Sequence, residues 1–165
     1  MAVIDIKNCT VTIQDGTTPT ALSLTVKIGE GNLVYTLRRN IEYILDRGVI
    51  DAVREGDQVP VDVRLDAVWE YIKGSSGSGT PTIADALRQT GEASAWVSTD
   101  ADACNPYAVD IILANLPVPA DCGDRETITL ADFRWEEQPF DLRAGTISIT
   151  GKCNITAPTV VRVAQ

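Results

Sequence analysis

The sequence predicts a mainly β protein, a β-sandwich or β-barrel with one short flanking α-helix. Three observations lead to this fold class. Short segments along the chain alternate apolar with polar residues, clusters of Gly, Pro, Asn and Asp separate these segments, and one segment carries a clear helix-start signal. A chain of 165 residues is long enough to bury its own core. We therefore expect one domain covering residues 1–165.

The first two strands are expected to form a hairpin. Apolar residues alternate over 4–13, and the apolar face changes near Asn8, which indicates a β-bulge. Residues 15–19 have the composition of a turn, and apolar residues alternate again over 22–28. The two runs separated by this turn therefore predict a β-hairpin.

A long strand is predicted over 33–45, because apolar residues occupy the odd positions there, with an interruption at Arg39. A short helix over 40–53 is the alternative, since some of its apolar residues also have helical spacing. Residues 47–57 are interpreted as a loop or hairpin tip. The clearest two-faced strand follows over 59–71, with one face towards the core and one towards water.

Two further features lie in the middle of the chain. Residues 73–80 are rich in Gly and Ser and are interpreted as a flexible loop within one domain. Thr82 then supplies an N-cap for a helix that begins at Ile83, with Asp85 in its first turn, and Gly91 is expected to end that helix.

The rest of the chain again predicts strands. Strand segments are expected at 95–97, 109–116, 128–135 and 147–155. Within 128–135 the apolar face changes between Leu130 and Phe133, which indicates a second β-bulge. The tail, 158–165, is apolar enough to add an edge strand.

Charge and composition exclude several function classes. The chain has 14 Lys and Arg against 23 Asp and Glu, a formal charge of −9, which argues against a protein that binds nucleic acid through clustered cations. It has no histidine, which excludes Ser-His-Asp, Cys-His and His-ligated metal sites. We identify no signal peptide and no apolar run long enough to span a bilayer, so we expect folding in the cytoplasm and no membrane insertion.

The cysteines give a weaker signal. Cys9, Cys104, Cys122 and Cys153 have no C-x-x-C spacing, so neither a zinc ribbon nor a redox motif is indicated. We interpret them as buried thiols, and a disulfide formed after release from the cell is the alternative.

Pairs of acidic residues are the candidates for catalysis. Asp62 with Asp66, or Glu136 with Glu137, could supply the two carboxylates that a glycosidase or aspartic protease needs. On alternating strands such acids more often form a solvated face. No nucleotide-binding loop and no nucleophile elbow is present. We therefore expect no enzyme, no catalytic residue and no cofactor.

A second acidic group could bind calcium. Asp100, Asp102 and Asp110 lie close together in sequence, but they lack the Gly and the terminal Glu of an EF-hand loop. We expect no metal site. The tryptophans and tyrosines could line a ligand groove, although the core or contacts between subunits are the favoured places for them.

Several motifs, in their order and spacing, resemble the tail tube (major tail) proteins of long-tailed bacteriophages. Each motif is unspecific by itself, and the likeness spans most of the chain. The matching segments are 29–33, 43–48, 54–61, 68–72, 83–87, 105–111 and 146–154.

The resemblance implies a structural virion protein with a β-barrel-like sandwich and a flanking helix. In this family six copies form a ring, and stacked rings form a hollow tube that conducts the genome. It implies self-association, partners among the tape-measure, tail-terminator and baseplate proteins, and transient, sequence-independent passage of DNA. The protein is then expected in the virion tail, after assembly in the cytoplasm of the bacterial host.

Two sets of residues are candidates for this role. Asp62, Asp66 and Glu70 lie on the polar side of the clearest strand and are expected to face the lumen, where Arg38 and Arg64 indicate local ion pairing; the tube exterior is the alternative place for these acids. The hairpin tip and the Gly/Ser loop are expected to contact neighbouring subunits, and solvated loops are the alternative. The contact residues are Arg47, Gly48, Arg54, Glu55, Gly56, Asp57, Lys73, Ser75 and Ser76.

Other functions stay open from the sequence alone. A tube or ring protein of a related injection apparatus, including a baseplate or tail-terminator ring, would share the general fold. A monomeric calcium- or carbohydrate-binding β-sandwich would use Asp100, Asp102 and aromatic residues. A hydrolase would need two carboxylates.

Overall fold

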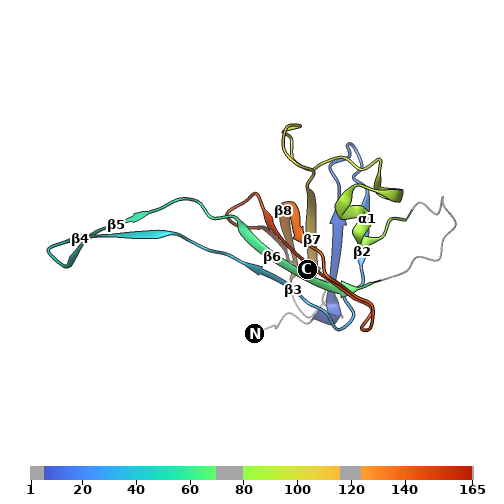
Figure 1. Cartoon of the computed structure of the whole chain (residues 1–165), viewed down its shortest axis with the longest axis horizontal. Coiled ribbons are helices and arrows are strands. Elements are labelled where there is room, and N and C mark those ends of the chain that lie inside the picture. Colours follow the sequence, from blue (N-terminus) through green and yellow to red (C-terminus); the bar gives the residue numbers. More distant parts are fainter. Residues whose placement is uncertain (1–5, 70–79, 116–123, 165) are drawn as a thin grey trace.

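The computed structural model describes residues 6–69, 80–115 and 124–164 as an antiparallel β protein with one α-helix (Figure 1). The prediction of a mainly β fold with one short helix is confirmed. None of the helices in these ranges has the length and apolar character needed to cross a bilayer. The strands are β1 (Cys9–Gln14), β2 (Ser23–Val26), β3 (Leu33–Thr36), β4 (Ile41–Asp46), β5 (Val49–Glu55), β6 (Val61–Val68), β7 (Val109–Asn115), β8 (Arg125–Glu137), β9 (Phe140–Asp141), β10 (Thr146–Cys153) and β11 (Thr159–Val163).

Nine strands form one sheet in the order β2-β1-β7-β8-β10-β6-β3, with β11 paired to β8 and β9 paired to β10. The long strand β8 joins two halves of this sheet. Residues near its start pair with β7 and β11, and residues from Phe133 onward pair with β10. Side chains from both halves meet in a single core, which includes Ile13 and Ile111 from one half and Leu65 and Ile149 from the other.

The first strand begins later than the sequence indicates. Residues 6–8 form a short 3-10 helix, η1 (Ile6–Asn8), so the expected bulge near Asn8 is wrong. The predicted hairpin is confirmed, since Val11 pairs with Val26 and Gln14 with Ser23. Residues 1–5 lie outside the described ranges.

The buried carboxylate of Asp15 holds the turn after β1. It accepts hydrogen bonds from the backbone N–H groups of Thr17 (3.2 Å), Leu22 (2.7 Å) and Val97 (3.1 Å), and also from the Thr17 hydroxyl. Burial opposes ionisation of this carboxyl, but these hydrogen bonds outweigh it and keep the pKa of Asp15 below its usual value. Asp15 therefore ties the β1–β2 hairpin to a loop that lies far away in the sequence.

The helix α1 (Ile83–Arg88) begins as predicted. The Thr82 hydroxyl accepts a hydrogen bond from the Asp85 N–H at 3.2 Å, and Ala86 and Leu87 pack into the core. The helix ends at Gln89, which has a left-handed backbone (φ 56°), rather than at Gly91. Gly91 instead begins a second 3-10 turn, η2 (Gly91–Ala93).

Residues 95–97 form a loop and not the predicted strand. Trp96 is buried in this loop, and its carbonyl oxygen accepts a hydrogen bond from the Gln89 side chain at 2.6 Å. The apolar character of this segment therefore reflects burial of one tryptophan rather than strand formation.

The change of apolar face in β8 is a β-bulge, as predicted. Val109 pairs with Phe133 and Ile111 with Leu130, so β8 holds one more residue than β7 between these pairs. Asp132 takes the extra position with a left-handed backbone (φ 54°). The bulge lets both Leu130 and Phe133 reach the core.

A second irregularity lies between Thr150 and Gly151, where β10 pairs with the end of β8. A Cβ atom on Gly151 would stand 2.1 Å from the Arg134 carbonyl oxygen, so only glycine fits at this close approach. The predicted C-terminal edge strand is confirmed as β11.

Candidate assembly surfaces

Strands β4 and β5 form a separate two-stranded hairpin that projects far from the body, and we call it the arm (Figure 1). The expected long strand 33–45 is divided between β3, in the main sheet, and β4, in the arm. The alternative helix over 40–53 is wrong. Residues 47–57, expected as a loop or hairpin tip, belong to a hairpin, but the tip is only the turn at Arg47 and Gly48, and Val49–Glu55 is a strand.

The arm reverses at Arg47 and Gly48 alone. Both residues have positive φ, 50° and 84°, and Asp46 pairs with Val49 on either side of them. Positive φ at both central residues is typical of a type I′ turn, whose twist matches that of an antiparallel hairpin. A tight turn of this kind extends regular pairing almost to the tip of the arm.

The arm is exposed along its whole length, including every residue of β5. Residues paired across the two strands share a face: Tyr43 pairs with Val53, and Leu45 pairs with Ile50. With Ile41 these residues form one face of exposed, mostly aliphatic side chains, which we call the apolar face of the arm. The opposite face carries the Glu42–Arg54 ion pair together with Ile44 and Val49.

Polar contacts support the arm only weakly. The Arg54–Glu42 pair (2.5 Å) and the Arg39–Glu55 pair (3.2 Å) are both solvent-exposed. Exposed ion pairs contribute about 0–1 kcal/mol each, and an isolated two-stranded hairpin is marginal in water. Burial of its apolar face against another surface would therefore add most of the stability of the arm.

The predicted contact residues lie in three places. Arg47 and Gly48 form the turn of the arm, and Arg54 and Glu55 end β5. Gly56 and Asp57 follow at the base, where the Gly56 N–H donates to the Asn40 carbonyl oxygen at 2.9 Å. Lys73, Ser75 and Ser76 lie outside the described residues.

The acids expected in the lumen belong to the polar face of the main sheet. In β6, Asp62, Arg64 and Asp66 alternate with four buried residues. Glu70 lies outside the described residues. Whether Asp62 and Asp66 face a bore stays a prediction.

The expected local pairing on this face is confirmed. Arg38 lies 3.1 Å from Asp62, and Arg64 lies 3.3 Å from Asp66. The Ser148 hydroxyl also donates to Asp66. Lys152, which stands opposite Asp62 in the register, lies 3.8 Å from Glu136. Basic side chains therefore pair with Asp62, Asp66 and Glu136 on this face.

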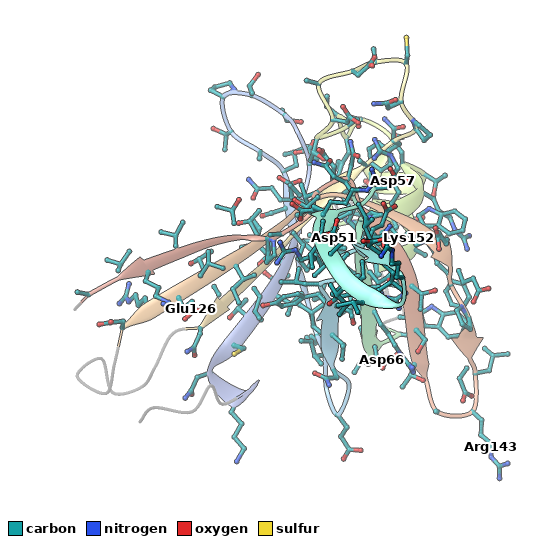
Figure 2. All side chains as sticks on the ribbon, turned by 90° about the vertical axis from the view of Figure 1, so that its left-hand side faces the viewer. Asp51, Asp57, Asp66, Glu126, Arg143 and Lys152 are labelled. Carbon is teal, nitrogen blue, oxygen red and sulfur yellow. The ribbon has the colours of Figure 1, made fainter. Side chains whose placement is uncertain are left out.

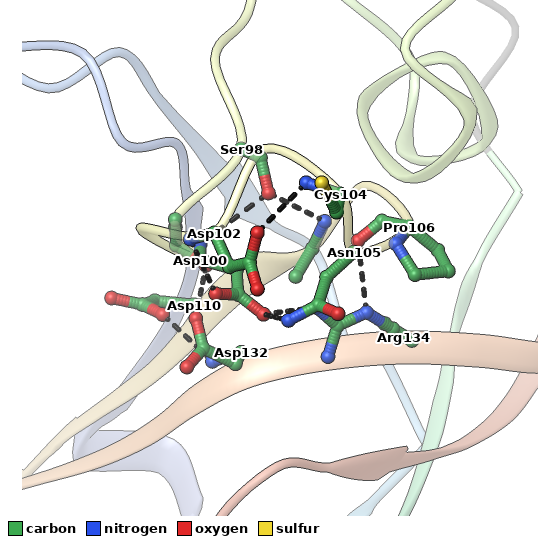
Figure 3. Close-up of polar contacts among 11 residues, drawn as sticks. Ser98, Asp100, Asp102, Cys104, Asn105, Pro106, Asp110, Asp132 and Arg134 are labelled. Carbon is green, nitrogen blue, oxygen red and sulfur yellow. Dashed lines mark hydrogen bonds and ion pairs between the residues drawn. The ribbon is translucent and has the colours of Figure 1, made fainter.

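Two of the acids considered for calcium, Asp100 and Asp102, organise a loop (Figure 3). Asp100 pairs with Arg134 at 2.5 Å and accepts hydrogen bonds from the Asp102 N–H and the Asn105 side chain, both at 2.9 Å. These contacts, led by the bond from the Asp102 N–H, lower the pKa of Asp100. Asp102 accepts from the Cys104 N–H at 2.9 Å.

Asp110 belongs to β7 and lies beside the bulge in β8. Its carboxylate accepts a hydrogen bond from the Asp132 N–H at 3.0 Å. Burial, and next the nearby charge of Asp132, raise its pKa in spite of this hydrogen bond. Within residues 6–69, 80–115 and 124–164, no group of three or more acidic, cysteine or histidine side chains is placed to hold a metal ion.

Two cysteines differ in their surroundings. Cys153 is buried in the core, where burial raises the pKa of its thiol to about 12. Cys104 is an exposed thiol, so the expectation of buried thiols is wrong for this residue. Cys122 lies outside the described residues.

A second exposed apolar surface lies where β6 ends and β10 begins, and we call it the aromatic end. The Trp69 and Phe140 rings lie 5.1 Å apart at 58°, and the Arg88 guanidinium lies 5.6 Å from the Phe140 ring and 5.7 Å from the Trp135 ring. Leu142, in the turn before β10, is 82% exposed. The sequence indicated subunit contacts for the tryptophans in general, but it gave no sign that these residues meet.

Comparisons with known proteins found few similarities. No family model and no curated protein matches the chain. Among solved structures it is similar to a chain of the anti-feeding prophage (AFP) baseplate, solved by cryo-EM with six-fold symmetry, at a TM-score of 0.43 and 12% identity. The match covers 93% of this chain and 92% of that chain.

Proposed function

We propose that this protein is a structural subunit that assembles with copies of itself into stacked rings, forming the tail tube of a long-tailed bacteriophage. The rings are hexameric, as in the tail tube proteins that the sequence resembles. The tube is a conduit for the genome, and the subunit has no catalytic role. The assembly belongs to the virion tail, where tape-measure, tail-terminator and baseplate proteins are its partners.

The observation that carries this proposal is the arm. A two-stranded hairpin with exposed apolar residues is unfavourable in a monomer, because these side chains stay exposed to water in the described part of the chain. The same hairpin becomes stable when it lies on another molecule. An exposed apolar hairpin of this kind therefore supports the proposal that the protein normally exists in an assembly.

Free strand edges support contacts between identical copies. Among the strands of the described residues, β3 pairs only with β6, and β11 pairs only with β8. Each of these strands therefore presents one unpaired edge, which a neighbouring chain can extend by backbone hydrogen bonds. A head-to-tail contact closes into a ring when its rotation closes, and a second contact along the axis stacks the rings.

The net charge suits a conduit for DNA. A hexamer would carry 6 × −9 = −54 formal charges, so the assembly as a whole would repel a polyanion at short range. Asp62 and Asp66 are proposed to face the bore, together with Glu70. Their pairing with Arg38 and Arg64 makes this wall less acidic than the net charge implies.

A second candidate is a ring protein of a related injection apparatus, such as a baseplate ring, which would use the same arm and edges without forming long tubes. Negative-stain electron microscopy of the purified protein, combined with light scattering over a range of concentrations, separates the candidates. We expect stacked tubes with an open centre. Single rings would favour the second candidate, and a strict monomer at high concentration would contradict both.

A further inference from the structure

We propose that the aromatic end is the surface that receives the arm of a second copy of this chain. This inference rests on the proposed self-assembly and names the two surfaces that meet. The donor is the apolar face of the arm, and the receptor is formed by Trp69, Trp135, Phe140 and Leu142.

The two surfaces lie at opposite ends of the same strand. The arm joins the body just before Val61, at the start of β6, whereas Trp69 follows the last residue of β6. Phe140 pairs with Ile147 of β10, close to the point where Thr146 stands opposite Val68. Figure 1 shows the arm extending away from this end of the body. An arm that points away from its own aromatic end can meet only that of another molecule, and such a head-to-tail contact repeats from copy to copy.

The two surfaces are also complementary in chemistry. The arm offers mainly aliphatic side chains on a narrow ribbon, and Leu45 and Ile50 near its tip are each 60% exposed. The aromatic end offers the flat rings of two tryptophans and a phenylalanine, which Arg88 holds together by stacking on two of them. Aromatic anchors surrounded by aliphatic contacts are typical of the centre of a protein interface.

Charges at the borders match as well. Asp46 and Asp51 lie near the tip of the arm, and within the described part of the chain they form no ion pair, although Arg47 lies between them in sequence. At the aromatic end, Arg88 and Arg143 have no carboxylate partner among the described residues. Figure 2, which looks along the arm, shows Arg143 extending away from the body. Two acids on the arm can therefore pair with two arginines on the neighbour.

Strand β11 is the competing receptor, because Val160, Val161 and Val163 are exposed there. The cation of this strand, Arg162, already pairs with Glu126 at 3.1 Å. Strand β11 therefore lacks a free arginine for the acids of the arm, whereas the aromatic end offers Arg88 and Arg143. The aromatic end is therefore the better match for the arm.

Intermolecular disulfide formation tests the inference. In a Cys104→Ser background, the double variant Ile50→Cys/Leu142→Cys places one thiol on each proposed surface, and both positions are exposed. Under mild oxidation we expect a ladder of covalent multimers on a non-reducing gel. The single-site variants and the background protein show how much cross-linking arises without the pair of surfaces.

The control Ile50→Cys/Val161→Cys uses β11 as the receptor and should give no ladder. A ladder from this control, or none from the first variant while the protein still forms tubes, would overturn the inference and leave the proposed function standing. Failure of the unmodified protein to assemble, as judged by light scattering, would remove the proposed function and the inference together.

Discussion

Replacing two exposed residues of the arm should weaken assembly without affecting the fold. In the variant Leu45→Thr/Ile50→Thr, the new residues are β-branched, which suits a strand, but they lose most of the apolar surface. Both native side chains are 60% exposed in the monomer. Full burial of such a side chain contributes about 1.5–3 kcal/mol, so the remaining 60% is worth about 1–2 kcal/mol each on docking.

The two losses together weaken each arm contact by about 2–4 kcal/mol. The protein concentration at which half of the subunits are assembled should therefore rise about 30- to 700-fold. Light scattering over a concentration series measures this shift. The free energy of unfolding of the monomer should change by less than about 0.5 kcal/mol per substitution, because neither side chain is in the core. Val49→Thr, on the opposite face of the arm, is the matched control and should assemble close to normally. Assembly of the double variant at the unmodified concentration would refute the role of the apolar face.

Three further predictions concern the body of the protein. Asp15→Ala leaves the N–H groups of Thr17, Leu22 and Val97 without their acceptor and should cost about 2–5 kcal/mol at pH 7, measured by chemical denaturation. Because folding lowers the pKa of Asp15, this difference should shrink as the pH falls below about 4. Gly151→Val forces a side chain against the Arg134 carbonyl oxygen and should prevent folding or lower the melting temperature sharply, whereas Lys152→Gln next to it should not. Folding raises the pKa of Asp110, so the folded protein loses stability as the pH rises through this pKa and the carboxyl becomes charged. Asp110→Asn removes this charge and should raise the melting temperature at pH 7, with little change near pH 3.

Strands with one buried face were predictable because their chemistry alternates. In β6 every second residue is buried, and the sequence pattern matches this burial. The bulge at Asp132 was also predictable, since Leu130 and Phe133 can both be buried only if an extra residue is inserted. In these places local sequence and tertiary packing give the same answer.

The arm could not be read in the same way. In β4 the sequence alternates as if one face were buried, but both faces are exposed, because burial of this hairpin depends on another molecule. In β5 the alternation is poor, so the sequence predicts only a loop or hairpin tip there and not a regular strand. Regular pairing of β5 follows from the Arg47-Gly48 turn and from contacts with β4. The sequence of β5 by itself does not reveal these contacts.

The aromatic end was hidden for a different reason. Trp135 and Phe140 come from strands β8 and β9, Trp69 follows the end of β6, and Arg88 comes from the helix. They meet because β6 and β10 pair and because α1 packs its buried face, including Leu87, on the core that these strands share. The pairing of Arg38 with Asp62 and of Arg64 with Asp66, in contrast, was predictable from charges that interrupt one polar face.

The position of the negative charge changes how DNA would pass through the proposed tube. On the polar face of the sheet, Asp62, Asp66 and Glu136 are paired with Arg38, Arg64 and Lys152, so these six side chains sum to zero and the charge of −9 arises elsewhere in the chain. If this face lines the bore, DNA meets a hydrated wall of paired charges rather than a bare acidic one. Each of these three cations already has a carboxylate partner, so a DNA phosphate must compete with that partner to bind. Phosphates would therefore bind each cation only weakly, which permits the DNA to slide. Low friction in such a tube would come from charges that are already paired with one another, with repulsion by the net charge as a secondary contribution.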